Sequence, residues 1–96
     1  KLPLQDHHFA TNKNKFYTPL MESMANYFGL KLHEAWNRML LPHLGRHPIV
    51  HNEVVLQYMA RAYAEAGNKK TFIKLFDRYV RQVIIDNPQF LRLIGW

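Results

Sequence analysis

The sequence predicts a small α+β domain in which helices outweigh strands. Its 96 residues are the length of a single domain. Hydrophobic residues make up 48% of the chain and charged residues 21%, which is the composition of a folded globular protein. Apolar residues recur at helical spacing in several segments, and two short segments have the pattern of strands. We therefore expect one domain over residues 1–96, with a helical extension over about 68–96.

The first predicted element is a short strand that runs into a polar loop. Residues 1–14 are polar and irregular, and the NKNK cluster at 12–15 is typical of an exposed turn. Thr18 before Pro19 predicts a helix N-cap followed by a proline in the first turn, and Gly29 is expected to end that helix. Its apolar stripe consists of Leu20, Met21, Met24, Tyr27 and Phe28.

Four further elements follow along the chain. A second short helix is expected over 30–37, and a short strand over 38–42 that a proline stops. A helix is expected from Pro48, whose missing N–H costs nothing in a first turn, to residue 66. A further helix is expected over 69–86, and a last turn over 88–94. The two long helices are expected to bury Val50, Val54, Val55, Tyr58, Met59, Ala62, Phe72, Ile73, Phe76, Tyr79, Val80, Val83 and Ile84.

The chain is basic and contains no cysteine. Thirteen Lys and Arg residues against seven Asp and Glu give a net charge of +6 with histidine neutral. Such a charge favours a polyanionic partner, most often nucleic acid. The absence of cysteine excludes disulfides, thiolate metal sites and cysteine nucleophiles. No apolar run approaches the roughly 18 residues that span a bilayer, so we expect no membrane partner.

Histidine is the most informative residue type in this chain. Six occur in 96 residues, and five of them lie at His7, His8, His43, His47 and His51. The H-x₃-H at 47–51 has a spacing at which two imidazoles on a helix can bind one cation. Adjacent histidines on a strand point in different directions, so one of the pair at 7–8 can bind a metal while the other acts as a general base. A structural zinc site has no use for such a spare histidine.

The order of these residues resembles the ββα-metal fold of HNH endonucleases, and more closely the AHH-type nuclease domain. That resemblance covers roughly residues 5–60. It is carried by DHHFATNKN at 6–14, YFGLKL at 27–32, Asn37, LPHLGRHP at 41–48 and His51. The AHH-type family is similar to colicin-type HNH nucleases and occurs at the C-terminal tips of bacterial polymorphic toxins, including Rhs proteins.

The resemblance implies a role for each of these side chains. His7, His47 and His51 would bind one divalent metal ion, and His8 would activate the attacking water. Asn37 would orient His8 or brace its loop. A second catalytic candidate, His43, would contact the phosphate, protonate the leaving oxygen or join the metal shell, and these alternatives stay open.

Three further residues have open roles. Arg38 and Arg46 are candidates for contact with the substrate phosphate, with a plain surface role as the alternative. Asp6 stands where the family usually has a small or apolar residue, just as Val50 replaces a frequent aromatic. Asp6 is expected to be a hydrogen-bond partner of a ligand histidine or an alternative metal ligand, in which case His7 would be the base.

The implied function is that of a metal-dependent endonuclease toxin. Its cofactor would be one divalent ion, with magnesium, manganese, zinc and nickel all open. Its substrate would be DNA, with RNA as an alternative, and its partner an acidic immunity protein. Because the chain begins at Lys1 without a signal peptide, we expect it to be a domain of a longer polypeptide. The resemblance implies that this parent is secreted and delivers the domain to the cytoplasm of a target bacterium. The alternative is a non-catalytic basic module, stapled by zinc, that binds nucleic acid without cutting it.

Overall fold

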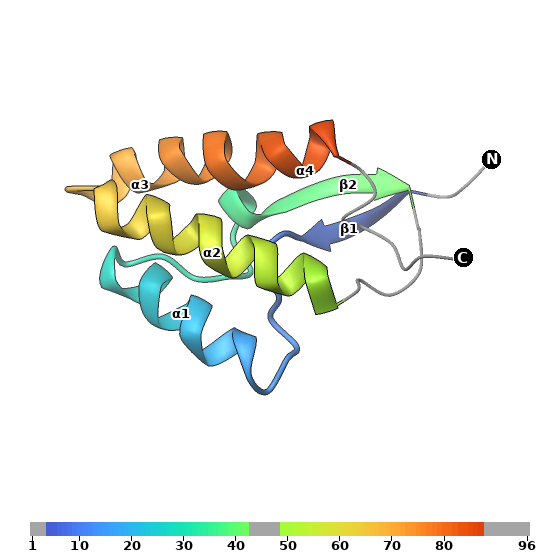
Figure 1. Ribbon diagram of the computed structural model, residues 1–96, viewed down its shortest axis with the longest axis horizontal. Helices are drawn as coiled ribbons and strands as arrows, with labels where there is room; N and C mark the ends of the chain where they lie inside the picture. Colours follow the sequence, from blue (N-terminus) through green and yellow to red (C-terminus); the bar gives the residue numbers. More distant parts are fainter. Residues whose placement is uncertain (1–3, 43–48, 88–96) are drawn as a thin grey trace.

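The computed structural model describes residues 4–42 and 49–87. Helix α2 (Ile49–Glu65) lies between α1 (Tyr17–Tyr27) and a continuous helical segment at the C-terminal end (Figure 1). That segment consists of α3 (Lys69–Phe76), the π-helical turn η2 (Asp77–Arg81) and α4 (Gln82–Asp86). A two-stranded sheet completes the fold, so the prediction of a helix-dominated α+β domain is confirmed. Within the described ranges, no helix is both long and apolar enough to cross a membrane.

The sheet joins two segments that are far apart in the sequence. Strand β1 (Leu4–His8) pairs antiparallel with β2 (Arg38–Pro42), and His8 lies opposite Arg38 in the register. Both predicted strands are therefore confirmed, the second with its predicted bounds. The short 3₁₀ helix η1 (Ala35–Asn37) leads directly into β2. This arrangement brings the end of the first strand next to the start of the second.

The side chain of Asn14, and not that of Thr18, binds the first N–H groups of the first helix. The Asn14 Oδ1 atom accepts hydrogen bonds of 2.9 Å from the backbone N–H groups of Phe16 and Tyr17. Thr18 lies inside the helix, and its hydroxyl donates to the Thr11 carbonyl at 2.8 Å. The predicted cap was wrong because the asparagine side chain reaches the first free N–H groups before the threonine does. Gly29, with a φ of +76°, ends the helix as expected.

The segment 30–37 does not form the predicted second helix. Its backbone N–H groups find other partners: Lys31 donates to the Glu34 carboxylate at 2.7 Å, and Leu30 donates to the Ala25 carbonyl at 2.9 Å. Such local bonds compete with helical hydrogen bonding. Only residues 35–37 wind into a short 3₁₀ turn.

The two long helices occur where they were predicted. Helix α2 ends at Glu65, and the described part of it begins at Ile49. The side chain of Asn68 caps α3 by accepting a 2.9 Å hydrogen bond from the N–H of Thr71. The π-helical turn was not predicted. The last predicted turn, 88–94, lies outside the described residues, as does the side chain of Val50.

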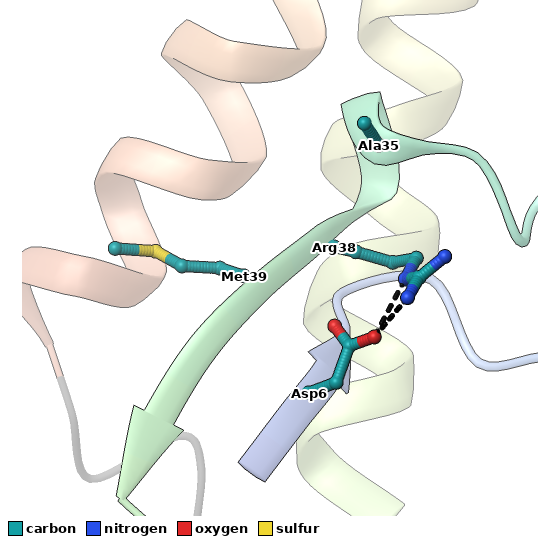
Figure 2. Close-up of a pocket in the computed structure, with 4 residues that line it drawn as sticks. All are labelled: Asp6, Ala35, Arg38 and Met39. Carbon is teal, nitrogen blue, oxygen red and sulfur yellow. Dashed lines mark hydrogen bonds and ion pairs between the residues drawn. The ribbon is translucent and has the colours of Figure 1, made fainter. Parts of the chain in front are cut away.

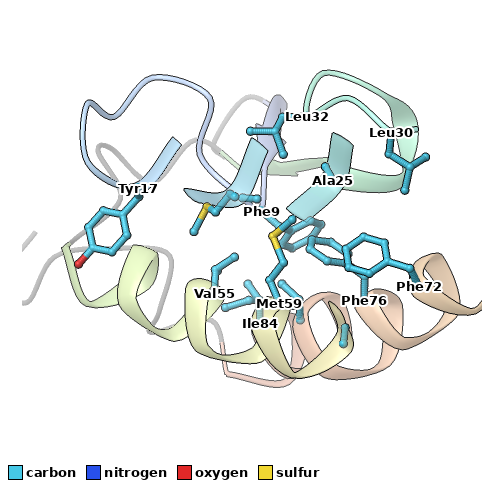
Figure 3. Close-up of a cluster of buried hydrophobic side chains, with 14 residues drawn as sticks. Phe9, Tyr17, Ala25, Leu30, Leu32, Val55, Met59, Phe72, Phe76 and Ile84 are labelled. Atoms are coloured by element: carbon cyan, nitrogen blue, oxygen red, sulfur yellow. The ribbon is translucent and has the colours of Figure 1, made fainter. Parts of the chain in front are cut away.

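The hydrophobic core lies between the helices and one face of the sheet (Figure 3). Three predicted core side chains are instead exposed: Leu20, Tyr27 and Tyr58, of which Tyr27 is 72% exposed. Their apolar spacing follows faces of α1 and α2 that are exposed in the described part of the chain. The fully buried side chains of largest volume in the described chain include Phe9, Phe72, Phe76, Met21 and Met59.

Phe72 lies at the centre of the aromatic part of this core. Its ring stacks on Phe28 at 4.9 Å between centroids and meets the edge of Trp36 at 5.8 Å. We expect Phe72→Ala to lower the free energy of unfolding by about 3–5 kcal/mol, because truncation leaves a cavity in a close-packed core. Urea denaturation followed by circular dichroism measures this loss.

Phe16→Ala is the matched control. Phe16 is 65% exposed, so its truncation should change the stability by about 0.5 kcal/mol or less. Equal losses in the two variants would contradict this description of the core.

Candidate active site

The paired histidines of β1 lie on opposite faces of the strand. Side chains alternate along a strand, so Asp6 and His8 share one face while His7 occupies the other. The burial of the three residues follows this alternation: His7 is 7% exposed, His8 is half-buried and Asp6 is exposed. One histidine therefore points into the protein, while its neighbour has access to solvent.

A buried asparagine holds the loop that follows His8. Asn37 is 0% exposed, and its Oδ1 accepts a 2.7 Å hydrogen bond from the N–H of Ala10. Its Nδ2 donates to the carbonyls of Ala10 at 2.9 Å and Leu32 at 2.8 Å. The Asn37 carbonyl also accepts a 2.9 Å bond from the N–H of Phe9. We call this set of bonds, from Asn37 to Phe9, Ala10 and Leu32, the Asn37 brace.

The brace corresponds to one of the two roles predicted for Asn37. Its hydrogen bonds go to the backbone directly after His8, so it braces the loop. With both polar ends of the amide engaged, the buried side chain is satisfied, as burial requires.

His51 connects the start of α2 to the same loop. The residue is fully buried, and its Nε2 lies 3.0 Å from the carbonyl oxygen of Phe9. A carbonyl can only accept a hydrogen bond, so Nε2 is the donor, and in the neutral imidazole the lone pair is then on Nδ1. A histidine that binds a metal commonly donates its other N–H to a backbone carbonyl in this way. The contact ties α2 to the backbone two residues beyond His7.

The surroundings of His8 favour its neutral form. Partial burial, and then the positive charge of Arg38, lower the pKa of His8 below its ordinary value, while Asp6 acts in the opposite direction. The amide nitrogen of Asn12 lies 3.5 Å from His8 Nε2. The lowered pKa keeps the imidazole of His8 unprotonated at neutral pH, which is the form that can accept a proton.

On the exposed face, Arg38 forms an ion pair with Asp6. The Arg38 Nε donates to Asp6 Oδ2 at 2.8 Å, its Nη2 contacts the same oxygen, and its Nη1 donates to the His33 carbonyl at 2.8 Å. This hydrogen bonding lowers the pKa of Asp6, so its carboxylate is ionised at neutral pH. The pair borders an open pocket of about 420 Å³ that Ala35 and Met39 also line (Figure 2).

Three predicted site residues, His43, Arg46 and His47, lie outside the described residues. The ligand set His7, His47 and His51 and the three alternatives for His43 therefore stay predictions. Among the side chains of residues 4–42 and 49–87, no group of three or more His, Cys, Asp or Glu is placed to hold a metal ion. The two ligand candidates that are described, His7 and His51, offer buried imidazole nitrogens, a donor type that suits zinc and nickel.

Asn12 is a neighbour of His8 that the sequence motifs did not predict. The NKNK cluster reads as an exposed turn, and Lys13 is indeed exposed. The loop nevertheless turns back far enough to place Asn12 beside a histidine four residues earlier. An asparagine four residues after the second histidine is the available signal, and it is too common to be recognised alone.

The chain matches the model of a known protein family. The model of AHH, described as a nuclease family of the HNH/ENDO VII superfamily with conserved AHH, matches residues 1–84. The chain reads DHH at 6–8, so Asp6 stands in the position of the conserved alanine. No curated protein and no solved structure gives a significant match.

The Asn37 brace can be tested by an isosteric change. Asn37→Asp replaces the donating Nδ2 with an oxygen that faces the carbonyls of Ala10 and Leu32. We expect a loss of about 1–3 kcal/mol for each buried carbonyl left without its donor, measured by urea denaturation. Asn26→Asp, at an exposed position, makes the same chemical change and should cost only a few tenths of a kcal/mol. If Asn37→Asp is as stable as that control, the brace does not hold the loop.

Proposed function

Because the chain belongs to the AHH nuclease family of the HNH/ENDO VII superfamily, we propose that it is a metal-dependent endonuclease that hydrolyses DNA, with His8 as the general base. The observation that carries this proposal is the separation of the paired histidines. His7 is buried and His8 is half-exposed beside Arg38, so the two side chains are suited to different tasks.

This separation favours one of the two assignments that the sequence leaves open. If Asp6 were the metal ligand and His7 the base, the base would be a buried side chain, and the ligand would be an exposed carboxylate paired with Arg38. If His7 is the ligand, the base is the accessible His8, and Asp6 is available to hold Arg38. The burial pattern supports the second assignment.

In this proposal, His8 and the residues around it have separate roles in the reaction. His8 accepts a proton from the water whose oxygen attacks the phosphorus, the bond from phosphorus to the 3′ oxygen breaks, and the leaving 3′ oxygen takes up a proton from solvent. The products carry a 5′-phosphate and a 3′-hydroxyl. The Asn37 brace fixes the backbone after His8 and so keeps the imidazole in place.

Arg38 is suited to contact the phosphate. Its bonds to Asp6 and His33 engage Nε, Nη1 and Nη2, and each terminal guanidinium nitrogen has a second N–H to donate. A guanidinium binds phosphate oxygens through two parallel hydrogen bonds. Arg38 also lies opposite His8 in the strand register, which places its backbone next to the proposed base.

The metal would be held by His7 and His51, together with His47. The tautomer of His51, fixed by the Phe9 carbonyl, supports this assignment because its Nδ1 has the lone pair that a metal requires. A divalent ion bound there would neutralise the negative charge that develops on the phosphate and the leaving oxygen. Magnesium, manganese, zinc and nickel are the candidates.

We further propose that the domain acts as a toxin. The basis for this role is its family, its basic net charge and the resemblance to the nuclease tips of polymorphic toxins. A larger secreted polypeptide would deliver it into a competing bacterium, where it would degrade DNA in the cytoplasm. An acidic immunity protein would protect the producing cell by complementing the positive charge of the domain.

The nuclease proposal is tested by cleavage of plasmid DNA with the purified domain. We expect nicking in the presence of magnesium, manganese, zinc or nickel and none after treatment with EDTA. His8→Ala should lower the rate about 100-fold or more, since a general base contributes roughly 10²–10⁴-fold. Metal binding, followed by isothermal titration calorimetry, should be retained in this variant because His8 is not a proposed ligand.

His33→Ala is the matched control, because His33 is an exposed histidine whose contact with Arg38 is made by its backbone carbonyl, which the change keeps. Its cleavage rate should equal that of the unmodified chain. Loss of metal binding in His8→Ala would make His8 a ligand and reject the assignment. A folded domain that binds zinc and DNA but never cuts would instead support the zinc-stapled binding module.

Arg38 gives a separate prediction about substrate binding. Arg38→Gln removes one phosphate contact, so the slope of log affinity against log salt concentration should become shallower by about 0.9 on duplex DNA. Fluorescence anisotropy over a salt series, in a His8→Ala background that prevents cleavage, measures this slope. Arg61→Gln is the control, since Arg61 is also an exposed arginine in an ion pair, with Glu65 at 2.9 Å. Identical slopes in the two variants would reject the phosphate role of Arg38.

A further inference from the structure

Arg81 reaches from the π-helical turn η2 to the segment that contains Asn37. Its Nη2 donates to the Trp36 carbonyl at 2.9 Å and to the Ala35 carbonyl at 3.5 Å, and its Nη1 donates to the Arg38 carbonyl at 3.3 Å. Its Nε pairs with Asp77 at 2.7 Å, within the same turn. One guanidinium therefore binds the backbone on both sides of Asn37.

The same guanidinium contacts the other half of the brace. Its central carbon lies 5.0 Å from the centroid of the Phe9 ring, within the range of a cation–π interaction. Phe9 directly follows His8 and is 1% exposed. Arg81 thus touches both segments that the Asn37 brace joins: the residues after β1 and the residues before β2.

The π-helical turn explains why Arg81 can reach this position. The buried residues of the C-terminal segment are spaced four apart: Phe72, Phe76, Val80 and Ile84. In a regular α-helix, a step of four residues turns the side chain by about 40° beyond a full rotation, so this row would leave the core. The wider turn at 77–81 absorbs the excess, and Arg81 follows Val80 toward the sheet. Single π turns inside helices are frequently found at functional sites.

We propose that Arg81 is a positioning residue for His8, acting through Phe9 and the Asn37 brace. This inference rests on the proposed function, because His8 is the base only in that proposal. Arg81 has a 21% exposed side chain, and its polar contacts are with the protein itself. It therefore acts on the rate of the chemical step and not on the binding of DNA.

Arg81→Lys is the informative variant. Lysine keeps the positive charge near Asp77 but has no planar fork with which to bind several carbonyls at once. The backbone amides of Phe9 and Ala10, which donate to Asn37, should exchange with solvent deuterium at least about tenfold faster than in the unmodified chain. Amides in the middle of α1 should be unaffected. This measurement does not depend on nuclease activity.

Kinetics then separate a positioning role from a merely structural one. At a temperature where the variant is fully folded, kcat for plasmid cleavage should fall about 10- to 100-fold, as expected for a misplaced catalytic group, while KM stays unchanged. Arg78→Lys is the matched control, because Arg78 is an exposed arginine of the same turn. Its kcat, KM and amide exchange should equal those of the unmodified chain.

Each of the other outcomes has one meaning. Unchanged exchange at Phe9 and Ala10, or a kcat equal to that of Arg78→Lys, overturns the proposal. A raised KM with unchanged kcat also overturns it, since Arg81 would then act on substrate binding. If the unmodified domain cuts no nucleic acid, the proposed function is rejected. The role of Arg81 toward His8 is then rejected as well, because it depends on that function. The exchange experiment would still decide whether Arg81 holds the Phe9 loop.

Discussion

The candidate site depends on one buried side chain, the amide of Asn37. It is the only kind of group in the standard set that can accept from one backbone N–H and donate to two carbonyls at once. Asn37 uses it for both polar groups of Ala10 and for the carbonyl of Leu32. Because an unsatisfied buried amide is costly, these segments cannot move apart independently. The loop after β1 therefore has a fixed position relative to the start of β2.

Because this loop is fixed, the alternation of side chains along β1 can separate the functions of successive residues. A strand presents successive residues to opposite faces, but this separates their functions only if the strand cannot rotate or slip. Pairing with β2 sets the register, and the Asn37 brace and the His51 contact with Phe9 hold its end. His7 is consequently kept inside the protein while His8 stays accessible. The chemistry proposed for two adjacent histidines follows from this constraint on the backbone.

Much of the fold could be predicted from local signals. Gly29 ends the first helix, and proline and periodic apolar residues mark the second strand and the long helices. The incorrect predictions, of a helix start and of a second helix, have a different local cause, which is hydrogen bonding between side chains and the backbone. Side chains of Asn14 and Glu34 bind nearby N–H groups and so shift a helix start and prevent a second helix. Propensity and periodicity do not register such bonds, because they depend on the path of the chain.

The site was predicted less completely than the fold. The paired histidines, Asn37 and His51 follow from motif order, and their surroundings in the structure are compatible with the roles expected of them. Arg81 could not be predicted, since the carbonyls that it binds on either side of Asn37 lie more than forty residues away. The four-residue spacing of its buried neighbours is a visible sign of a π turn. What that turn brings together depends on the packing of the whole domain.

Asp6 differs from the alanine of the AHH that the family conserves, and its contribution is positional. It stands at the conserved alanine and forms an exposed ion pair with Arg38. Exposed ion pairs contribute only about 0–1 kcal/mol to stability, so the fold does not require this one. The pair does fix the guanidinium on the face of the sheet that His8 shares, at the edge of the open pocket. An alanine would leave Arg38 held by the His33 carbonyl alone among these contacts, with greater freedom to turn away. The substitution therefore affects where the positive charge lies and not how firmly the domain is folded.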